Sequence, residues 1–135
     1  MVDAEVIHEA LLLPCTTAEC ETGPVAEHRP ASLSLCYDAE AETGIVWTAI
    51  EFELVCAARF TAEVACLPWM IRAYSRVCEF EGSGWLHELR AAAASQNMLL
   101  SPSARHFFVY FDHVGCWEVM ADDVQLGSPL SETSR

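Results

Sequence analysis

The sequence feature that most constrains the fold is a pair of aromatic and β-branched runs. Residues 106–111 read His-Phe-Phe-Val-Tyr-Phe, and residues 116–121 read Cys-Trp-Glu-Val-Met-Ala. Aromatic and β-branched residues are enriched in strands, and the linker Asp112-His-Val-Gly115 supplies turn-forming residues. We therefore predict that the two runs are central strands of a sheet, joined as a hairpin.

A second hairpin is predicted earlier in the chain. Apolar and polar side chains alternate over residues 32–38, and again over residues 46–56, where Glu51 and Glu53 point away from the apolar face. Alternation with a period of two is typical of a half-buried strand. Residues 39–44 end in glycine and form the expected turn, so the face that carries the two glutamates should meet solvent.

Two helices are predicted between the hairpins. Apolar residues recur at helical spacing from Pro68 to Cys78. Ser83 is a good N-cap for a second apolar stripe that starts at Trp85 and continues through an Ala-rich stretch. The expected fold class is therefore α+β, with an antiparallel sheet of about four strands from two hairpins and two helices packed on one face, in the order ββααββ.

The 135 residues are expected to form one domain with two less regular ends. Residues 1–31 are interpreted as an N-terminal segment and linker, in which residues 3–13 could form a short helix and the remainder carries three prolines. Residues 32–126 are the α+β domain, and residues 127–135 are a flexible tail. The domain is expected to stay folded without the N-terminal segment.

The charge of the chain restricts the class of partner. Its formal net charge is −13, from 20 acidic residues against 7 arginines and no lysine. Nucleic acids and anionic membranes are bound through clustered lysine and arginine, so neither is expected as a partner. A basic protein partner fits better, although acidity can also serve only to keep an apolar protein soluble.

The cysteines and the apolar stretches predict a cytoplasmic protein. The first residues are acidic, whereas a secretory signal begins with basic residues, and the longest candidate membrane span is interrupted by Glu51, Glu53 and Arg59. An odd number of cysteines in such a chain indicates reduced, mostly buried thiols without disulfides or zinc. The seven cysteines are Cys15, Cys20, Cys36, Cys56, Cys66, Cys78 and Cys116.

A catalytic interpretation would use Cys116 as a nucleophile, with His106 or His113 as its base and Asp112 as the orienting acid. Cys116, however, begins a predicted strand and does not follow a glycine-rich elbow or open a helix. The alternative is a buried thiol beside a turn in which Gly115 adopts a positive φ. We favour that alternative and assign no catalytic residue.

A metal site would combine Cys15 and Cys20 with His8 or His28. Their Cys-x₄-Cys spacing lies at the loose limit for zinc, and no second close pair follows. Nucleotide-binding glycine motifs and the His-Glu-x-x-His motif are absent from the sequence. We therefore expect no metal-binding residues, no cofactor-binding residues and no cofactor.

Residues 45–121 resemble small uncharacterised bacterial proteins. The resemblance is carried by His106-Phe-Phe-Val-Tyr-Phe-Asp-His-Val-Gly-Cys-Trp-Glu-Val-Met-Ala121, following Ser83-Gly-Trp-Leu-His-Glu-Leu89. These proteins have an aromatic strand, an Asp-x-x-Gly turn and a further strand with the pattern aromatic-Glu-Val-x-Ala. Some proteins of this type are immunity partners of toxins, so the resemblance implies a binding role and supplies no catalytic residue.

Three functional hypotheses follow. The first is a non-enzymatic acidic protein-binding domain that could act as a toxin-neutralising immunity protein. The second is a structural or assembly subunit that forms a homo- or hetero-oligomer, with a homodimer as one form. The third is a cysteine-dependent enzyme that uses Cys116.

Overall fold

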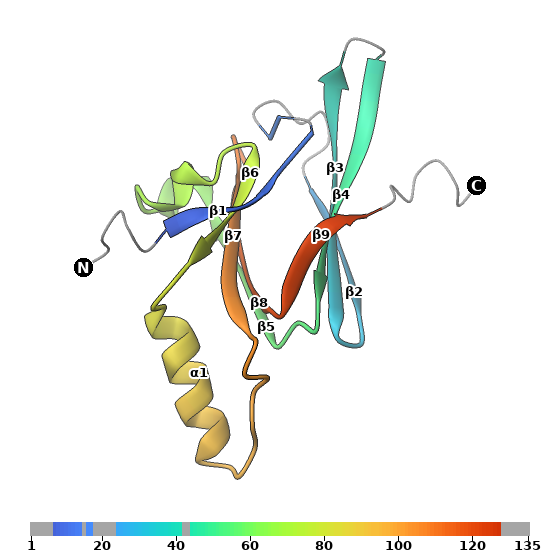
Figure 1. The fold of residues 1–135 in the computed structure, drawn as a ribbon. Coiled ribbons are helices and arrows are strands. Elements are labelled where there is room, and N and C mark those ends of the chain that lie inside the picture. Colours follow the sequence, from blue (N-terminus) through green and yellow to red (C-terminus); the bar gives the residue numbers. More distant parts are fainter. Residues whose placement is uncertain (1–6, 15, 18–23, 42–43, 128–135) are drawn as a thin grey trace.

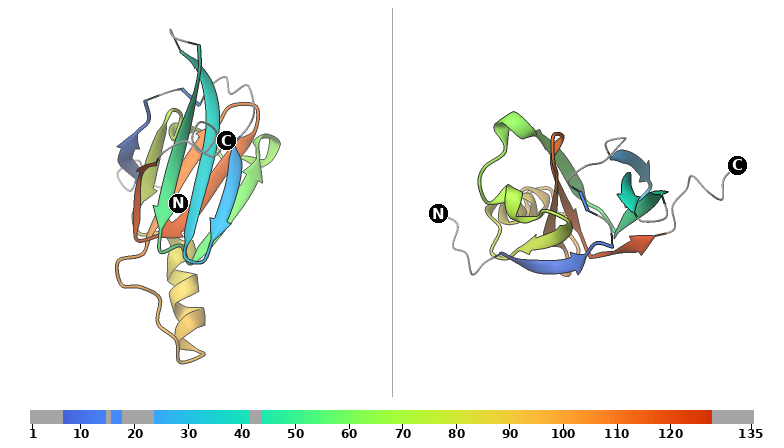
Figure 2. Two further views of the ribbon diagram at one scale, coloured as in Figure 1. Left: turned by 90° about the vertical axis from the view of Figure 1, so that its right-hand side faces the viewer. Right: turned by 90° about the horizontal axis from the view of Figure 1, so that it is seen from above.

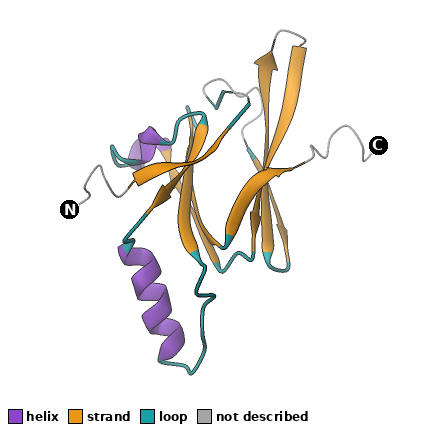
Figure 3. Ribbon diagram, in the orientation of Figure 1, coloured by secondary structure: helices purple, strands orange, loops and turns teal. Residues whose placement is uncertain are grey.

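The protein folds as two antiparallel β-sheets that pack face to face (Figure 1). This computed structural model describes residues 7–14, 16–17, 24–41 and 44–127, and within them it contains nine strands and one α-helix. Figures 2 and 3 show the two layers and the helix, which extends beyond one end of them. The expected α+β fold with a single sheet and two helices in the order ββααββ is therefore wrong.

The larger sheet contains the predicted C-terminal hairpin at its centre. Its five strands lie in the order β1-β6-β7-β8-β5. The prediction of a central hairpin is confirmed, because β7 and β8 pair antiparallel from Arg105 opposite Ala121 to Phe111 opposite Gly115. The strands are β1 (Ile7–Leu12), β6 (Arg76–Phe80), β7 (Arg105–Phe111), β8 (Gly115–Ala121) and β5 (Ala57–Ala62).

The smaller sheet contains the other predicted hairpin. Its strands β2 (Val25–Arg29), β3 (Ser32–Ala41), β4 (Gly44–Glu53) and β9 (Asp123–Gly127) lie in the order β2-β3-β4-β9. Ser32 pairs with Glu53 and the pairing continues to the turn, so the hairpin prediction is confirmed. Strand β4 ends earlier than expected, because Leu54 has a φ of 55° and turns the chain away toward β5.

The main core lies between the two sheets. Alternate residues of β3 and β4, including Leu33, Leu35 and Phe52, meet alternate residues of β7 such as Phe107 and Val109, and all five side chains are fully buried. This period-two alternation allows each strand of the smaller sheet to bury one face and expose the other.

A second cluster covers the opposite face of the larger sheet. Two short 3₁₀ turns, Glu63–Ala65 and Met70–Arg72, cover this face, and Met70 and Ala73 belong to one buried cluster with Phe108 of β7. The helix expected from Pro68 to Cys78 is therefore wrong, and its last residues belong to β6. Val77 and Cys78 are adjacent and both buried, as a strand requires when each of its faces is covered.

The second predicted helix is present as α1 (Gly84–Ala94). As expected, Ser83 is its N-cap, and the Ser83 hydroxyl oxygen accepts a hydrogen bond from the Leu86 amide at 3.1 Å. The helix contains no fully buried residue. It is therefore held to the body of the protein mainly at its N-terminal end (Figure 1).

The N-terminal region contributes strands to both sheets. Within residues 1–31, β1 pairs with β6 and β2 pairs with β3. Because both strands belong to the sheets, we no longer expect the domain to stay folded without this segment. The expected helix at residues 3–13 is corrected, because Ile7–Leu12 forms a strand and the residues before Ile7 lie outside the described part. Of the expected tail at residues 127–135, only Gly127 is described, and it ends β9.

Candidate functional site

Cys116, the nucleophile of the catalytic interpretation, is a fully buried thiol. It lies on β8 beside Met70 and Phe108, and its sulfur donates to the carbonyl oxygen of Trp117 at 3.7 Å. Burial raises the pKa of the Cys116 thiol far above its ordinary value, and the negative charge of Glu118 raises it further. A neutral, inaccessible thiol is a poor nucleophile.

The two histidines that were considered as bases interact with other residues. His113 is exposed in the turn between β7 and β8, with its Nε2 atom 3.6 Å from Asp112. His106 is buried on β7 and is bonded to Ser83 and Glu118. The structure thus brings Asp112 and His113 together. In the described part of the chain, the Cys116 sulfur bonds to neither histidine.

The residues considered for zinc are not assembled in the described structure. Cys15 and Cys20 lie outside the described residues. His8 lies on β1 of the larger sheet, with its Nε2 atom 3.7 Å from Glu79, whereas His28 lies on β2 of the smaller sheet. The two histidines therefore belong to different layers.

Another group of side chains has the donor types of a metal site. One ligand atom from each of Glu63, Asp112 and His113 lies within 4.8 Å of the others. The Glu63 carboxylate already accepts hydrogen bonds from the Tyr110 hydroxyl at 2.9 Å and from the His113 amide at 2.8 Å. These bonds lower the pKa of Glu63. Together they fasten the residues 63–65 turn to the β7–β8 hairpin.

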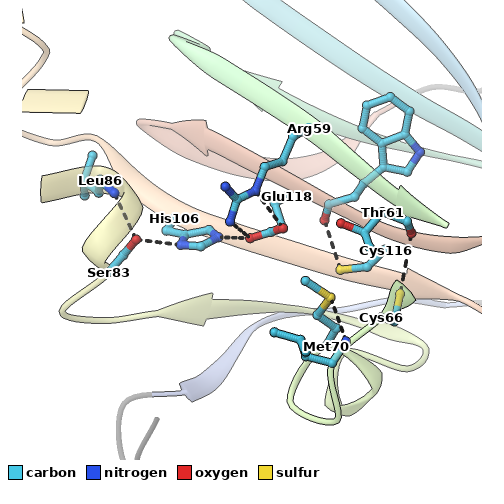
Figure 4. A network of polar contacts seen from close by, with 11 residues as sticks. Arg59, Thr61, Cys66, Met70, Ser83, Leu86, His106, Cys116 and Glu118 are labelled. Atoms are coloured by element: carbon cyan, nitrogen blue, oxygen red, sulfur yellow. Dashed lines mark hydrogen bonds and ion pairs between the residues drawn. The ribbon is translucent and has the colours of Figure 1, made fainter. Parts of the chain in front are cut away.

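A buried polar network joins three strands to the start of α1 (Figure 4). The Glu118 carboxylate accepts from Arg59 at 2.9 and 3.0 Å and from His106 Nε2 at 2.8 Å. The other ring nitrogen of His106 lies 2.8 Å from the hydroxyl oxygen of Ser83. The Arg59 guanidinium also lies over the Trp85 ring, 3.9 Å from its centroid, which closes the network into a loop.

The hydrogen bonds that Glu118 accepts keep its buried carboxyl group charged. Burial raises the pKa of its carboxyl, but the hydrogen bonds from His106 and Arg59 outweigh burial, so the pKa lies below its ordinary value. Since the side chain of Glu118 is completely inaccessible, its charge depends on these partners.

The sequence of contacts Ser83, His106, Glu118 has the composition of a hydrolase triad, but its geometry is that of a structural link. Ser83 is only 7% exposed, and its oxygen is occupied by the Leu86 amide as the helix cap. A nucleophilic oxygen must reach its substrate. We interpret the network as the device that attaches α1 to the larger sheet.

Sequence reasoning missed this network, although one signal for it was available. Glu118 is a charged residue in the middle of an otherwise apolar predicted central strand. A carboxylate in that position needs a buried partner, and His106 of the neighbouring run was the nearest candidate. The arginine that completes the network comes from β5, which had not been predicted.

The outer face of the smaller sheet (right-hand sheet in Figure 1), called here the acidic face, carries more acidic than basic side chains. Backbone pairing places Glu27, Ser34 and Glu51 in one row, and Glu53 and Asp123 in the next. Where all four strands lie side by side, the outward residues are Val25, Glu27, Arg29, Ser32, Ser34, Cys36, Ala49, Glu51, Glu53, Asp123, Gln125 and Gly127. The expectation that Glu51 and Glu53 face solvent is confirmed.

A hollow of about 190 Å³ lies on the acidic face. It is lined by Arg29, Ser32, Ser34, Cys36, Ala49, Glu51 and Glu53. The hollow exists because the central positions carry small side chains. Beside the hollow, Gly127 of β9 leaves room for the carboxyl group of Glu51, since a Cβ atom at Gly127 would collide with it.

A second surface is apolar. The segment from β5 to the residue before β6 exposes several large hydrophobic side chains, with 97% of Val64 and 53% of Leu67 accessible. We call it the apolar segment, and its exposed large hydrophobic residues are Phe60, Val64, Leu67, Ile71 and Tyr74. Strand β5 is also an edge of the larger sheet.

Fold and surface together define a two-sheet β domain with an acidic outer face. Comparisons with protein-family models, with curated proteins and with solved structures find no match to this chain. The resemblance of residues 45–121 to immunity-type proteins therefore stays a prediction. Within the described residues, no helix combines the length and the apolar character needed to cross a membrane.

Proposed function

We propose that this chain is a non-enzymatic protein-binding domain whose acidic face docks a basic partner. The observation that carries the proposal is the charge of that face, where Glu27, Glu51, Glu53 and Asp123 stand against Arg29. Complementary charge is a common source of specificity and of rapid association between proteins.

The net charge of the whole chain supports the same partner. With a net charge of −13 the protein attracts cationic surfaces over a distance, and the acidic face is where we expect such a surface to bind. Such an interaction weakens steeply with ionic strength, since exposed charges are screened within about 8 Å at physiological salt.

A toxin-neutralising immunity protein of the cytoplasm is the finer form of the proposal. It rests on the resemblance of residues 45–121 and on the odd number of cysteines in the chain. A basic toxin, such as a nuclease, has the charge that the acidic face would recognise. Co-expression with such a toxin should restore growth, and the restoration should depend on the glutamates of the acidic face.

The apolar segment supports one alternative, a subunit that assembles with its own copy. Contiguous apolar surface on a soluble protein often marks an interface. Sedimentation at several concentrations distinguishes the two functions. An assembly subunit would dimerise as the concentration rises, and Leu67→Glu would abolish the dimer, whereas a binding domain for a basic partner would stay monomeric.

Selection of a random peptide display library tests the proposal. We expect peptides rich in arginine and lysine to be recovered on the wild type and lost on a variant that carries Glu→Gln at residues 27, 51 and 53. A matched control carries Glu→Gln at residues 9, 81 and 88, which changes the net charge equally but leaves the acidic face intact. Recovery of the same peptides on both variants would refute the proposed face.

A further inference from the structure

We infer that the hollow on the acidic face receives the side chain of an arginine from the basic partner, an inference that rests on the proposed function. The inference is based on the size of the hollow, on the two glutamates at its wall and on the small side chains of its floor.

The size of the hollow restricts its occupant to one side chain. Pockets for drug-sized ligands and cofactors have volumes of roughly 300–1,000 Å³. The hollow measures about 190 Å³, which is too small for such ligands. Its floor is made of the short side chains of Ser32, Ser34, Cys36 and Ala49. Cys36 and Ala49 are buried, so an incoming side chain would lie over the half-buried Ser32 and Ser34.

Two glutamates at successive outward positions of β4 line the wall of the hollow. Glu51 and Glu53 are both outward residues of β4, so their Cα atoms are roughly 7 Å apart along the strand. A guanidinium presents donors on several sides of a plane and can bond to two carboxylates at once. A lysine ammonium is a compact point charge and would satisfy only one of them well.

The carboxylates of Glu51 and Glu53 at the wall are available to pair with a cation from outside the chain. In the described part of the chain no cationic side chain pairs with Glu51, and Glu53 accepts only a neutral donor, the Gln125 amide at 3.3 Å. The hydroxyl groups of Ser32 and Ser34 can accept further hydrogen bonds from the same guanidinium.

Arg29 sits at the rim of the hollow and opposes an incoming cation. Its guanidinium lies 3.7 Å from Glu27 and its side chain is 65% exposed, so it is held only weakly. Replacing Arg29 by glutamine removes a like charge from the rim. We therefore expect Arg29→Gln to strengthen the binding of an arginine. If Arg29 instead supported the shape of the hollow, the same substitution would weaken binding.

Calorimetry with hexa-arginine and hexa-lysine peptides on the full chain tests the inference. We expect hexa-arginine to bind more tightly, and Glu51→Gln to weaken its binding roughly tenfold, as the loss of one charge-assisted hydrogen-bond partner would. The matched variant Glu88→Gln changes the net charge equally on α1 and should weaken binding less than roughly twofold. Ser34→Leu fills the hollow without changing the charge, and it should remove the preference for arginine. Melting temperatures establish that each variant is folded.

Two outcomes overturn the inference in different ways. If the triple glutamine variant of the acidic face loses both peptides equally, and Glu51→Gln behaves like Glu88→Gln, the face binds cations without using the hollow. In that case the proposed function stands and the arginine inference fails. If neither peptide responds to the triple variant, the proposed function and the inference fail together.

Discussion

Replacing Arg59 by methionine should reveal how strongly the buried network stabilises the fold. Arg59 donates two of the three hydrogen bonds that hold the Glu118 carboxylate, whose side chain is inaccessible to solvent. Breaking a buried ion pair by removing one partner costs about 3–5 kcal/mol. Because Arg59 is half-exposed and His106 still contacts Glu118, we expect the lower end, about 3 kcal/mol at pH 7, which lowers the melting temperature by roughly 10 °C.

The loss of stability caused by Arg59→Met should decrease as the pH is lowered. In the wild type the pKa of Glu118 is lowered, so its stabilisation is complete above the ordinary carboxyl pKa and is lost as the pH falls through the lower folded-state value. Without Arg59, one of the two partners that lower the pKa of Glu118 is lost, so burial moves this pKa upward and the charged carboxylate is less favourable in the folded variant. The difference in stability between the two proteins should therefore be largest near pH 7 and shrink toward pH 4.

Urea unfolding at a series of pH values, followed by tryptophan fluorescence, measures this difference. The matched control is Arg76→Met, because Arg76 makes an exposed ion pair with Glu9 at 3.7 Å and should contribute no more than about 1 kcal/mol. An Arg59→Met variant that is no less stable than Arg76→Met, or whose deficit does not depend on pH, would refute the reasoning.

The other predictions concern the hairpin turn, the thiols and the N-terminal strands. Gly115→Val should destabilise the protein by about 3 kcal/mol or more in thermal unfolding, because Gly115 has a φ of 145° and a Cβ atom there would collide with the Thr61 carbonyl. In the control Gly84→Ala the added Cβ atom meets open space, so stability should change by less than about 1 kcal/mol. Iodoacetamide should modify the exposed Cys56 of the native protein well before the buried Cys116, as peptide mapping would reveal, and equal rates would contradict the burial. A chain without residues 1–30 should lack a cooperative melting transition, since it loses β1 and β2, and a sharp transition would mean that the two strands are dispensable.

The two hairpins and α1 could be predicted because their local signals agree with their tertiary setting. In β3 and β4 one face is buried and the other is exposed, so the pattern of period two is visible in the sequence. The β7–β8 hairpin is rich in aromatic residues because both of its faces are covered. Ser83 marked the start of α1 correctly, since its side chain caps the helix.

The remaining strands could not be read from local pattern. In β1 only Ile7 is fully buried, and in β9 only Val124, so most of each strand is a solvated edge or rim. Their strand conformation comes from pairing with a neighbour far along the chain, which no window of sequence records. Strand β6 was mistaken for a helix because the spacing of Ile71, Tyr74 and Val77 imitates a helical stripe, yet Ile71 and Tyr74 are exposed.

The candidate site was predicted only in part. The sequence indicated a wet strand face with Glu51 and Glu53, but the row that adds Glu27 depends on the pairing of β2 with β3. The hollow likewise depends on which small side chains lie opposite one another across the sheet. Sequence spacing fixes the face of a residue within one strand, whereas register between strands fixes its neighbours.

Mapping where a basic ligand binds tests the central claim most directly. Hexa-arginine would be titrated into ¹⁵N-labelled protein, and the change of each backbone amide resonance would be recorded. If the acidic face is the docking site, the largest changes will fall on Ser34, Glu51 and Glu53 and their neighbours in β3 and β4. Changes that concentrate instead on α1 or on the apolar segment, with β3 and β4 unaffected, would contradict it.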